Sequence, residues 1–284
     1  MKVKPWLLFL PSLVLVLFNA FLPICAVISY SLHYVFPSVP AEFLGLEQYR
    51  RLLNDPDFLG ALYRGLLFSF ECMAIEIPLG LGIALMLPKK GVVGGVSLAL
   101  IAVPLVIPWM TVGLMWRMLT YQGVGPMPFF LSKLGIQFDM TKPVHAFQTL
   151  VLMDVWHWTP LVVLLMSAGL TALPEEYYEA AKIDGARARR IFRFVTLPGL
   201  KSPLLVLLLL RFIDTFKIYD EVWVLTAGGP GNATTFLSIF TVRLGIGAFN
   251  LGYGSAVSLT FLYVVLTVCF ILMVVMTKGR GLNE

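Results

Sequence analysis

The chain has 284 residues, of which 58% are hydrophobic and only 13% are charged, with a formal net charge of +5 at pH 7. Soluble proteins carry about a quarter charged residues, and a soluble domain of this size cannot bury so much apolar surface. We therefore expect an integral membrane protein. The basic residues are spread over separate loops, which excludes a nucleic-acid-binding surface. The three cysteines lie inside apolar runs, which favours small buried side chains over disulfides or metal ligands.

Six apolar runs are long enough to cross a bilayer as helices, which takes about 20 residues each. They cover residues 5–31, 60–88, 93–121, 146–172, 200–226 and 254–277. The first run is too long for the core of a signal peptide and has no cleavage pattern, so we expect a retained span. Little remains outside the runs. The sequence predicts an all-α membrane protein with six transmembrane helices in one domain, residues 1–284.

The orientation follows from the lysines and arginines, which gather on the cytoplasmic side of membrane proteins. With the N-terminus inside, the cytoplasmic segments carry twelve of them: Lys2, Lys4, Lys89, Lys90, Lys182, Arg187, Arg189, Arg190, Arg193, Lys201, Lys278 and Arg280. The outer segments carry six: Arg50, Arg51, Arg64, Lys133, Lys142 and Arg243. This asymmetry predicts that both termini and the loop 174–199 are cytoplasmic.

Glu71 and Glu76 lie in the second run. A carboxylate in hydrocarbon is costly, so each is expected to face the bundle interior, a partner or water. Five residues apart on a helix, the two side chains point about 140° apart, which predicts different roles. Hydrogen bonding to neighbouring helices and a place on a solute pathway both remain open. In the third run, Pro104 and Pro108 predict a bend, either purely structural or lining a cavity.

The fourth run holds a polar and aromatic group, Asp154 and Trp156-His157-Trp158. Aromatic faces suit sugar rings and carboxylates suit hydroxyls, whereas an interfacial aromatic belt is the competing interpretation. In the fifth run, Arg211 and Asp214 are three residues apart, which predicts an ion pair. The candidate solute-pathway residues are Glu71, Glu76, Asp154, Trp156, His157, Asp214, Lys217, Tyr219 and Asp220.

Residues 174–199 are the most charged stretch of the chain. Pro174 suits the first position of a helix, and acids follow in the first turn, where the helix dipole favours them. Gly185 is a turn signal, and residues 186–194 predict a second short helix. The pattern predicts a helix-turn-helix outside the bilayer, between the fourth and fifth spans.

The same stretch contains Glu179-Ala180-Ala181, three further residues, Gly185, nine further residues and then Val195-Thr196-Leu197-Pro198. It resembles the cytoplasmic coupling loop of permease subunits of bacterial binding-protein-dependent ABC importers, with valine at 195 where isoleucine is usual. Two other segments resemble the carbohydrate-uptake (maltose/glycerol-phosphate-like) group of these permeases. They are residues 43–58, whose expected role is local packing, and Leu225-Thr226-Ala227-Gly228-Gly229-Pro230.

The resemblance implies a non-catalytic subunit of a bacterial inner-membrane importer. The implied partners are a second homologous permease, two cytoplasmic ATP-binding subunits, an extracytoplasmic substrate-binding protein and the lipid bilayer. ATP and Mg²⁺ are expected on the ATPase, because this chain has no Gly-x-x-x-x-Gly-Lys-Ser/Thr motif; no cofactor, metal or catalytic residue is expected here. The implied ATPase-coupling residues are Glu179, Ala180, Ala181, Asp184, Gly185, Ala186, Arg190, Leu197 and Pro198.

A different class of transporter also accounts for the acids within the spans. An ion-gradient-driven secondary transporter would use Glu71, Glu76, Asp154 and Asp214 as proton or sodium sites, although it gives no reason for the charged loop. A channel is a third and weaker alternative. The residues fit a sugar, a polyol or a sugar phosphate as the solute, and they leave open whether the solute site lies in this chain or in its partner.

Overall fold

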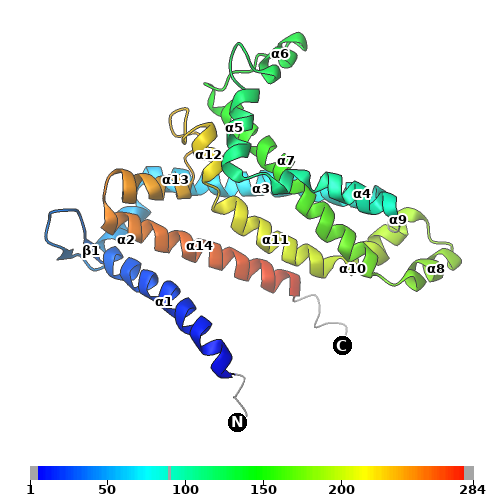
Figure 1. Cartoon of the computed structure of the whole chain (residues 1–284), viewed down its shortest axis with the longest axis horizontal. Coiled ribbons are helices and arrows are strands. Elements are labelled where there is room, and N and C mark those ends of the chain that lie inside the picture. The colour runs from blue at the N-terminus through cyan, green and yellow to red at the C-terminus, as the bar shows by residue number, and fades with distance from the viewer. Residues whose placement is uncertain (1–5, 89–90, 278–284) are drawn as a thin grey trace. The chain divides into compact units, whose positions relative to one another are not determined.

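The structure, a computed structural model, describes residues 6–88 and 91–277 and is mostly helical (Figure 1). The chain divides into two units, and each is described by itself. The first comprises residues 6–61 with Ile239–Val264, and the second comprises Leu62–Ser238 with residues 265–277. The two termini that were predicted to be cytoplasmic, together with Lys89 and Lys90, lie outside the described residues.

The first unit begins with α1 (Trp6–Ser31), whose apolar side chains from Phe9 onward are largely exposed, as in a helix that faces lipid. A hairpin of β1 (His33–Tyr34) and β2 (Glu42–Phe43) follows, with His33 opposite Phe43, and then comes α2 (Glu47–Leu53). The remaining elements are the start of α3 (Pro56–Met86), the end of α13 (Leu237–Val242), the π-helical η3 (Arg243–Gly247) and the first part of α14 (Leu251–Thr277).

Asp55 organises the start of α3. Its Oδ1 accepts the backbone N–H of Asp57 at 2.9 Å, so the carboxylate caps the positive end of the helix. Its Oδ2 accepts the hydroxyl of Tyr253 in α14 at 2.5 Å, and the Arg51 guanidinium lies 4.6 Å from the centre of the Tyr253 ring. Arg51 and Asp55 therefore connect residues 43–58 to α14 within the first unit, and the local packing role expected of this segment stays a prediction.

The second unit is built on three long helices: α3, α7 (Pro143–Ala172) and α11 (Lys201–Phe216). Their apolar core includes Val162, Met166 and Leu207. Small residues let the helices approach closely. A Cβ on Gly80 of α3 would lie only 2.6 Å from Cβ of Val162 in α7, so the α3–α7 crossing requires glycine.

The third apolar run, 93–121, is not one continuous helix. It consists of α4 (Val92–Ile101), the 3₁₀-helical η1 (Val103–Val106) and α5 (Trp109–Leu119). Pro104 lies in η1 and Pro108 directly precedes α5. Proline lacks the N–H that would continue the helical hydrogen bonds, so the helix is interrupted at these positions. The predicted bend is confirmed, and the structure divides the run into separate helices on either side of it.

The fifth run, 200–226, is also interrupted. It consists of α11 and the short α12 (Asp220–Leu225), separated by residues 217–219. α12 lies side by side with α5 (Figure 1). A Cβ on Gly113 of α5 would lie 2.9 Å from the carbonyl oxygen of Glu221, so glycine again permits this close contact. After α12, the Thr235 hydroxyl donates to the carbonyl of Gly228 at 2.9 Å and closes the Gly-Gly-Pro turn.

A loop with the short α6 (Pro126–Lys133) connects α5 to α7. Within it, the backbone N–H and the hydroxyl of Thr141 both donate to Oδ1 of Asp139 at 2.8 Å. The backbone hydrogen bond is the main reason that the pKa of the Asp139 carboxyl lies below its ordinary value.

Four helices in the described chain are long and apolar enough to cross a membrane: Phe9–Ser31, Pro56–Met86, Pro143–Ala172 and Leu251–Met276. A fifth span results if Ala188–Gly199 and Lys201–Leu225, which meet at 63°, are counted as one. The helical membrane class is therefore confirmed. The count of six spans stays a prediction, because the interrupted third run is not among these helices.

Candidate functional site

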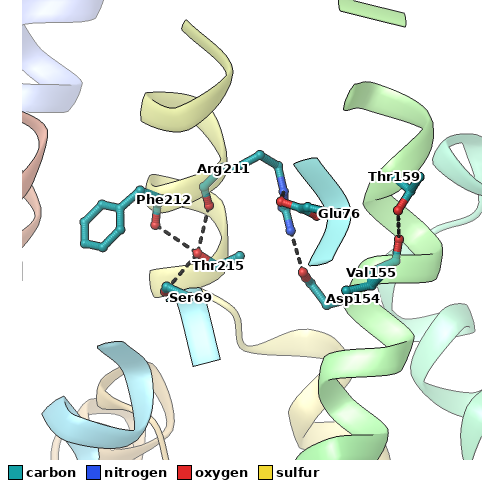
Figure 2. Close-up of polar contacts among 8 residues, drawn as sticks. All are labelled: Ser69, Glu76, Asp154, Val155, Thr159, Arg211, Phe212 and Thr215. Atoms are coloured by element: carbon teal, nitrogen blue, oxygen red, sulfur yellow. Dashed lines mark hydrogen bonds and ion pairs between the residues drawn. The ribbon is translucent and has the colours of Figure 1, made fainter. Parts of the chain in front are cut away.

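Arg211 of α11 lies at the centre of a buried ionic cluster (Figure 2). Its Nε donates to Oε1 of Glu76 in α3 at 2.6 Å, and its Nη2 donates to Oδ2 of Asp154 in α7. The Glu76 and Arg211 side chains are 0% exposed and the Asp154 side chain is 2% exposed. One guanidinium therefore joins the three long helices of the second unit.

This ionic cluster lowers the cost of placing charges inside a helix bundle. A buried charge without a partner is expensive, and breaking a buried pair leaves such a charge behind. The hydrogen bonding is nevertheless incomplete, because Oε2 of Glu76 and Nη1 of Arg211 have no partner among the described residues. The guanidinium also lies 4.8 Å from the centre of the Trp158 ring, a cation–π distance. Arg211 thus holds both Asp154 and Trp158 in position.

A cavity of about 90 Å³ lies beside the ionic cluster, within the second unit. Its aromatic walls are Trp109, Trp158 and Tyr219, and its polar lining is Asp154, Asp214, Lys217, Asp220 and Glu221. One water needs roughly 10–15 Å³, so the cavity has room for several. The ring centres of the two tryptophans are 6.4 Å apart. Aromatic walls with a few convergent polar groups are typical of small-molecule sites.

Two helix breaks create this cavity. The break before α5 places Trp109 at its wall, and the break between α11 and α12 places residues 217–221 there. Irregular backbone at membrane depth is tolerated where it is buried in protein or lines a cavity. The interruptions of the third and fifth runs therefore coincide with the candidate site.

Five of the predicted solute-pathway residues line the cavity, and four do not. Asp154, Asp214, Lys217, Tyr219 and Asp220 are the five, whereas Glu71, Glu76, Trp156 and His157 lie elsewhere. Glu76 belongs to the ionic cluster. Glu71 instead accepts a hydrogen bond from Nε2 of Gln148 at 2.9 Å, so the two glutamates have different partners, as their spacing predicts.

The remaining two residues of the α7 group take different positions. Trp156 packs edge-on against Trp116 of α5, with ring centres 6.3 Å apart. His157 is buried and stacks on Trp158, and neither of its ring nitrogens has a hydrogen-bond partner among the described residues. Of the two, His157 thus contacts a residue of the cavity wall, Trp158.

The predicted pair of Arg211 with Asp214 is wrong. Asp214 pairs with Lys217 at 3.0 Å, and Arg211 pairs with the two acids on other helices. Arg211, Glu76 and Asp154 are all buried, and a buried charge needs a partner of opposite charge. Trp109, Trp158 and Glu221 also line the cavity but are absent from the predicted set. The proline before Trp109 was the available signal for that residue.

The second candidate region is the segment 174–199. It contains α8 (Glu175–Ile183), α9 (Ala188–Ile191), the π-helical η2 (Phe192–Thr196) and α10 (Leu197–Gly199). Gly185 ends α8 with a φ of 71°, which glycine adopts without strain. The N–H of Ala186 donates to the carbonyl of Ala181 at 2.9 Å, and that of Gly185 donates to Lys182 at 3.0 Å.

These two bonds form a Schellman motif, the common glycine-dependent end of an α-helix. The motif gives a physical reason for the spacing between Ala181 and Gly185, because the carbonyl at position 181 receives the N–H that follows the glycine. The Tyr178 hydroxyl lies 3.2 Å from Oγ1 of Thr196 and ties α8 to η2. The segment is therefore a defined turn between helices rather than an irregular loop.

The surface of this segment is open. Glu179, Ala180, Asp184, Gly185, Arg190, Leu197 and Pro198 are exposed, and Ala181 and Ala186 are half-buried. A hollow of about 450 Å³ between α8 and η2 is lined by residues that include Tyr177, Ala181 and Phe194. A second, arginine-lined hollow includes Arg187 and Arg193. The segment presents small, apolar and charged groups that this chain leaves accessible.

The matches to known proteins cover both regions of the chain. Residues 76–279 match the family described as binding-protein-dependent transport system inner membrane component. The chain is 38% identical over 266 residues to a trehalose/maltose transport system permease protein of Thermococcus litoralis, covering 91% of this chain and 89% of the relative. It is 30% identical to an arabinooligosaccharides transport system permease protein of Bacillus subtilis, covering 95% and 87%.

The fold is also known. A bacterial alginate ABC transporter, solved in complex with a periplasmic protein bound to an alginate pentasaccharide, contains a chain that matches with a TM-score of 0.81. The match covers 97% of this chain and 95% of that one at 18% identity, so it concerns the fold alone. From the family match and the two relatives, this chain belongs to the inner membrane components of binding-protein-dependent transport systems.

Proposed function

We propose that this chain is one of two permease subunits of an ATP-driven importer and forms half of the pathway for a sugar, a polyol or a related solute. The partners are a second homologous permease, two cytoplasmic ATP-binding subunits and an external substrate-binding protein. The names of the relatives, which transport trehalose, maltose or arabinooligosaccharides, support a carbohydrate. Six spans with both termini inside fit this assembly.

The observation that carries the proposal is the exposed segment 174–199. Its motif residues are accessible, its turn at Gly185 is well defined, and the chain itself has no phosphate-binding motif. Such a surface needs a partner that hydrolyses ATP. We assign the contact with the ATPase to Glu179, Ala180, Ala181, Asp184, Gly185, Ala186, Arg190, Leu197 and Pro198.

The contact is connected to the candidate solute cavity by one helix. α10 leads into α11 through a bend of 63°. α11 carries Arg211 and, one turn later, the cavity residue Asp214, and the cavity residue Lys217 directly follows its end. When the ATPase changes shape, it biases the permease between two states, and a rigid helix transmits that bias. The ionic cluster makes α3 and α7 move together with α11.

The secondary-transporter alternative is disfavoured by family membership and by the ion pairs. Of its four acids, Glu76 and Asp154 are paired with Arg211 and Asp214 is paired with Lys217, so they are not free ion sites. The acids instead stabilise and line the pathway.

Uptake into proteoliposomes containing the complete importer tests the proposal. We expect maltose, used as a neutral probe with its binding protein, to accumulate only with ATP and to be insensitive to an uncoupler. Accumulation that survives ATP depletion and collapses with the uncoupler would establish the gradient-driven alternative instead.

A further inference from the structure

The fold of this chain does not decide the charge of the solute. The solved transporter with the same fold is described as an importer of an acidic polysaccharide, whereas trehalose and maltose are uncharged. The charge class must therefore come from the residues that line the pathway.

The cavity beside the ionic cluster has an excess of acids. Four carboxyl groups line it, those of Asp154, Asp214, Asp220 and Glu221, against one basic side chain, that of Lys217. The ammonium of Lys217 is already bound to Asp214 at 3.0 Å. Arg211 does not line the cavity, because its guanidinium lies behind the wall on Glu76 and Asp154.

Two of the carboxyl groups have no cation of their own. Among the described residues, neither Asp220 nor Glu221 forms a salt bridge, although Glu221 is only 5% exposed. A buried acid at a cavity wall needs hydrogen-bond donors or a positive charge from whatever enters. Hydroxyl groups of a sugar are such donors, and hydrogen bonds from them to a carboxylate are strong.

The aromatic walls of the cavity also suit a sugar ring. The side chains of Trp109, Trp158 and Tyr219 give the apolar C–H groups of a sugar ring a surface to contact, while its hydroxyls meet the carboxyl groups. A phosphate, carboxylate or sulfate on the same ring would face like charges without a free cation, and like charges at short range repel strongly where water is scarce.

We infer that this cavity selects uncharged or cationic sugar rings and rejects anionic ones, with Asp220 and Glu221 as the specificity-determining residues. The inference rests on the proposed function, because it places the solute path through this cavity. It removes sugar phosphates from the candidate solutes.

Intrinsic fluorescence tests the selection without the binding protein, because two of the chain's tryptophans line the cavity. The purified permease–ATPase complex is titrated with three probes of one ring size: methyl glucoside, glucuronate and glucosamine. We expect methyl glucoside and glucosamine to change the fluorescence at concentrations at least about tenfold below glucuronate, a tenfold ratio being a typical cost of one unfavourable charge contact. Trp158→Phe should remove most of the signal.

Two neutral variants locate the effect. D220N and E221Q should each reduce the ratio between the effective concentrations of glucuronate and methyl glucoside at least about threefold. Asp139→Asn makes the same charge change in the loop between α5 and α7, outside the cavity lining, and should leave the ratio of the two effective concentrations unchanged. If E221Q fails to assemble, D220N decides the matter alone.

Equal binding of glucuronate and methyl glucoside, an unchanged ratio in D220N, or no fluorescence change with any probe would each overturn the inference. ATP-dependent maltose uptake by the same preparation is measured in parallel. Uptake without charge selection contradicts only the inference, whereas selection without ATP-dependent uptake contradicts only the proposed function.

Discussion

The ionic cluster and the segment 174–199 handle charge in opposite ways. Arg211, Glu76 and Asp154 are buried and neutralise one another across three helices. Arg187, Arg189, Arg190 and Arg193 are exposed, and none forms a salt bridge within the described chain. Charges that the chain satisfies internally stabilise its core, whereas charges that it leaves open are available to a partner. The two regions therefore separate the support of the fold from the contact with the rest of the importer.

Removing the central cation is expected to have the largest effect. Arg211→Met leaves two buried carboxylates without a partner and should cost about 3–5 kcal/mol of stability. The measurement is the melting temperature of the purified complex. Adding Glu76→Gln and Asp154→Asn to the same chain should recover part of the loss, because no uncompensated charge then remains; a triple variant less stable than Arg211→Met would contradict the charge argument.

A change at the α3–α7 crossing should have the next largest effect. Gly80→Ala places a Cβ 2.6 Å from the Val162 side chain and should destabilise the complex by about 1–3 kcal/mol through overpacking. Gly82→Ala is the matched control, because a Cβ there meets nothing within 4 Å, and it should be neutral or slightly stabilising. Equal melting temperatures for the two variants would show that the helices separate easily here.

The turn that ends α8 gives a functional contrast at modest stability cost. Gly185→Val forces a β-branched residue to a φ of 71° and should cost about 1–2 kcal/mol locally. We expect uptake to fall at least about tenfold, which corresponds to about 1.4 kcal/mol of lost coupling, while the amount of protein in the membrane is unchanged. Gly135→Val, at a φ of 76° in the loop between α5 and α7, carries the same strain and should transport normally. Similar uptake in both variants would remove the special role of the 185 turn.

An exposed arginine in the first unit should show the smallest effect. Arg50 lies 3.8 Å from Glu47, with side chains 81% and 63% exposed. Surface pairs contribute roughly 0–1 kcal/mol, so Arg50→Met should barely shift the melting temperature. The comparison with Arg211→Met uses one chemical change in two environments. A shift as large as that of Arg211→Met would show that burial does not set the cost.

Much of the molecule follows from local sequence. The apolar runs predict the helices, the prolines predict the bend at 104–108, and the Gly185 position predicts the turn. The partners of Arg211 do not follow, because Glu76 and Asp154 are 135 and 57 residues away and only the packed bundle brings them together. The rule that residues three apart on a helix can pair selects Asp214, because it considers the residues of one helix only. Five residues of the cavity lining were predicted, but Trp109 and Glu221 were not, because they meet where the first turns of α5 and α12 pack together.

The central claim is that the segment 174–199 is the contact with the ATPase. A photo-crosslinking amino acid at Ala180, which is exposed near the start of the motif, tests it in membranes that contain the complete importer. The control position is Leu134, which is 74% exposed in the loop between α5 and α7. We predict that position 180 captures the ATP-binding subunit and position 134 does not. Capture at neither position, or at both alike, would contradict the assignment.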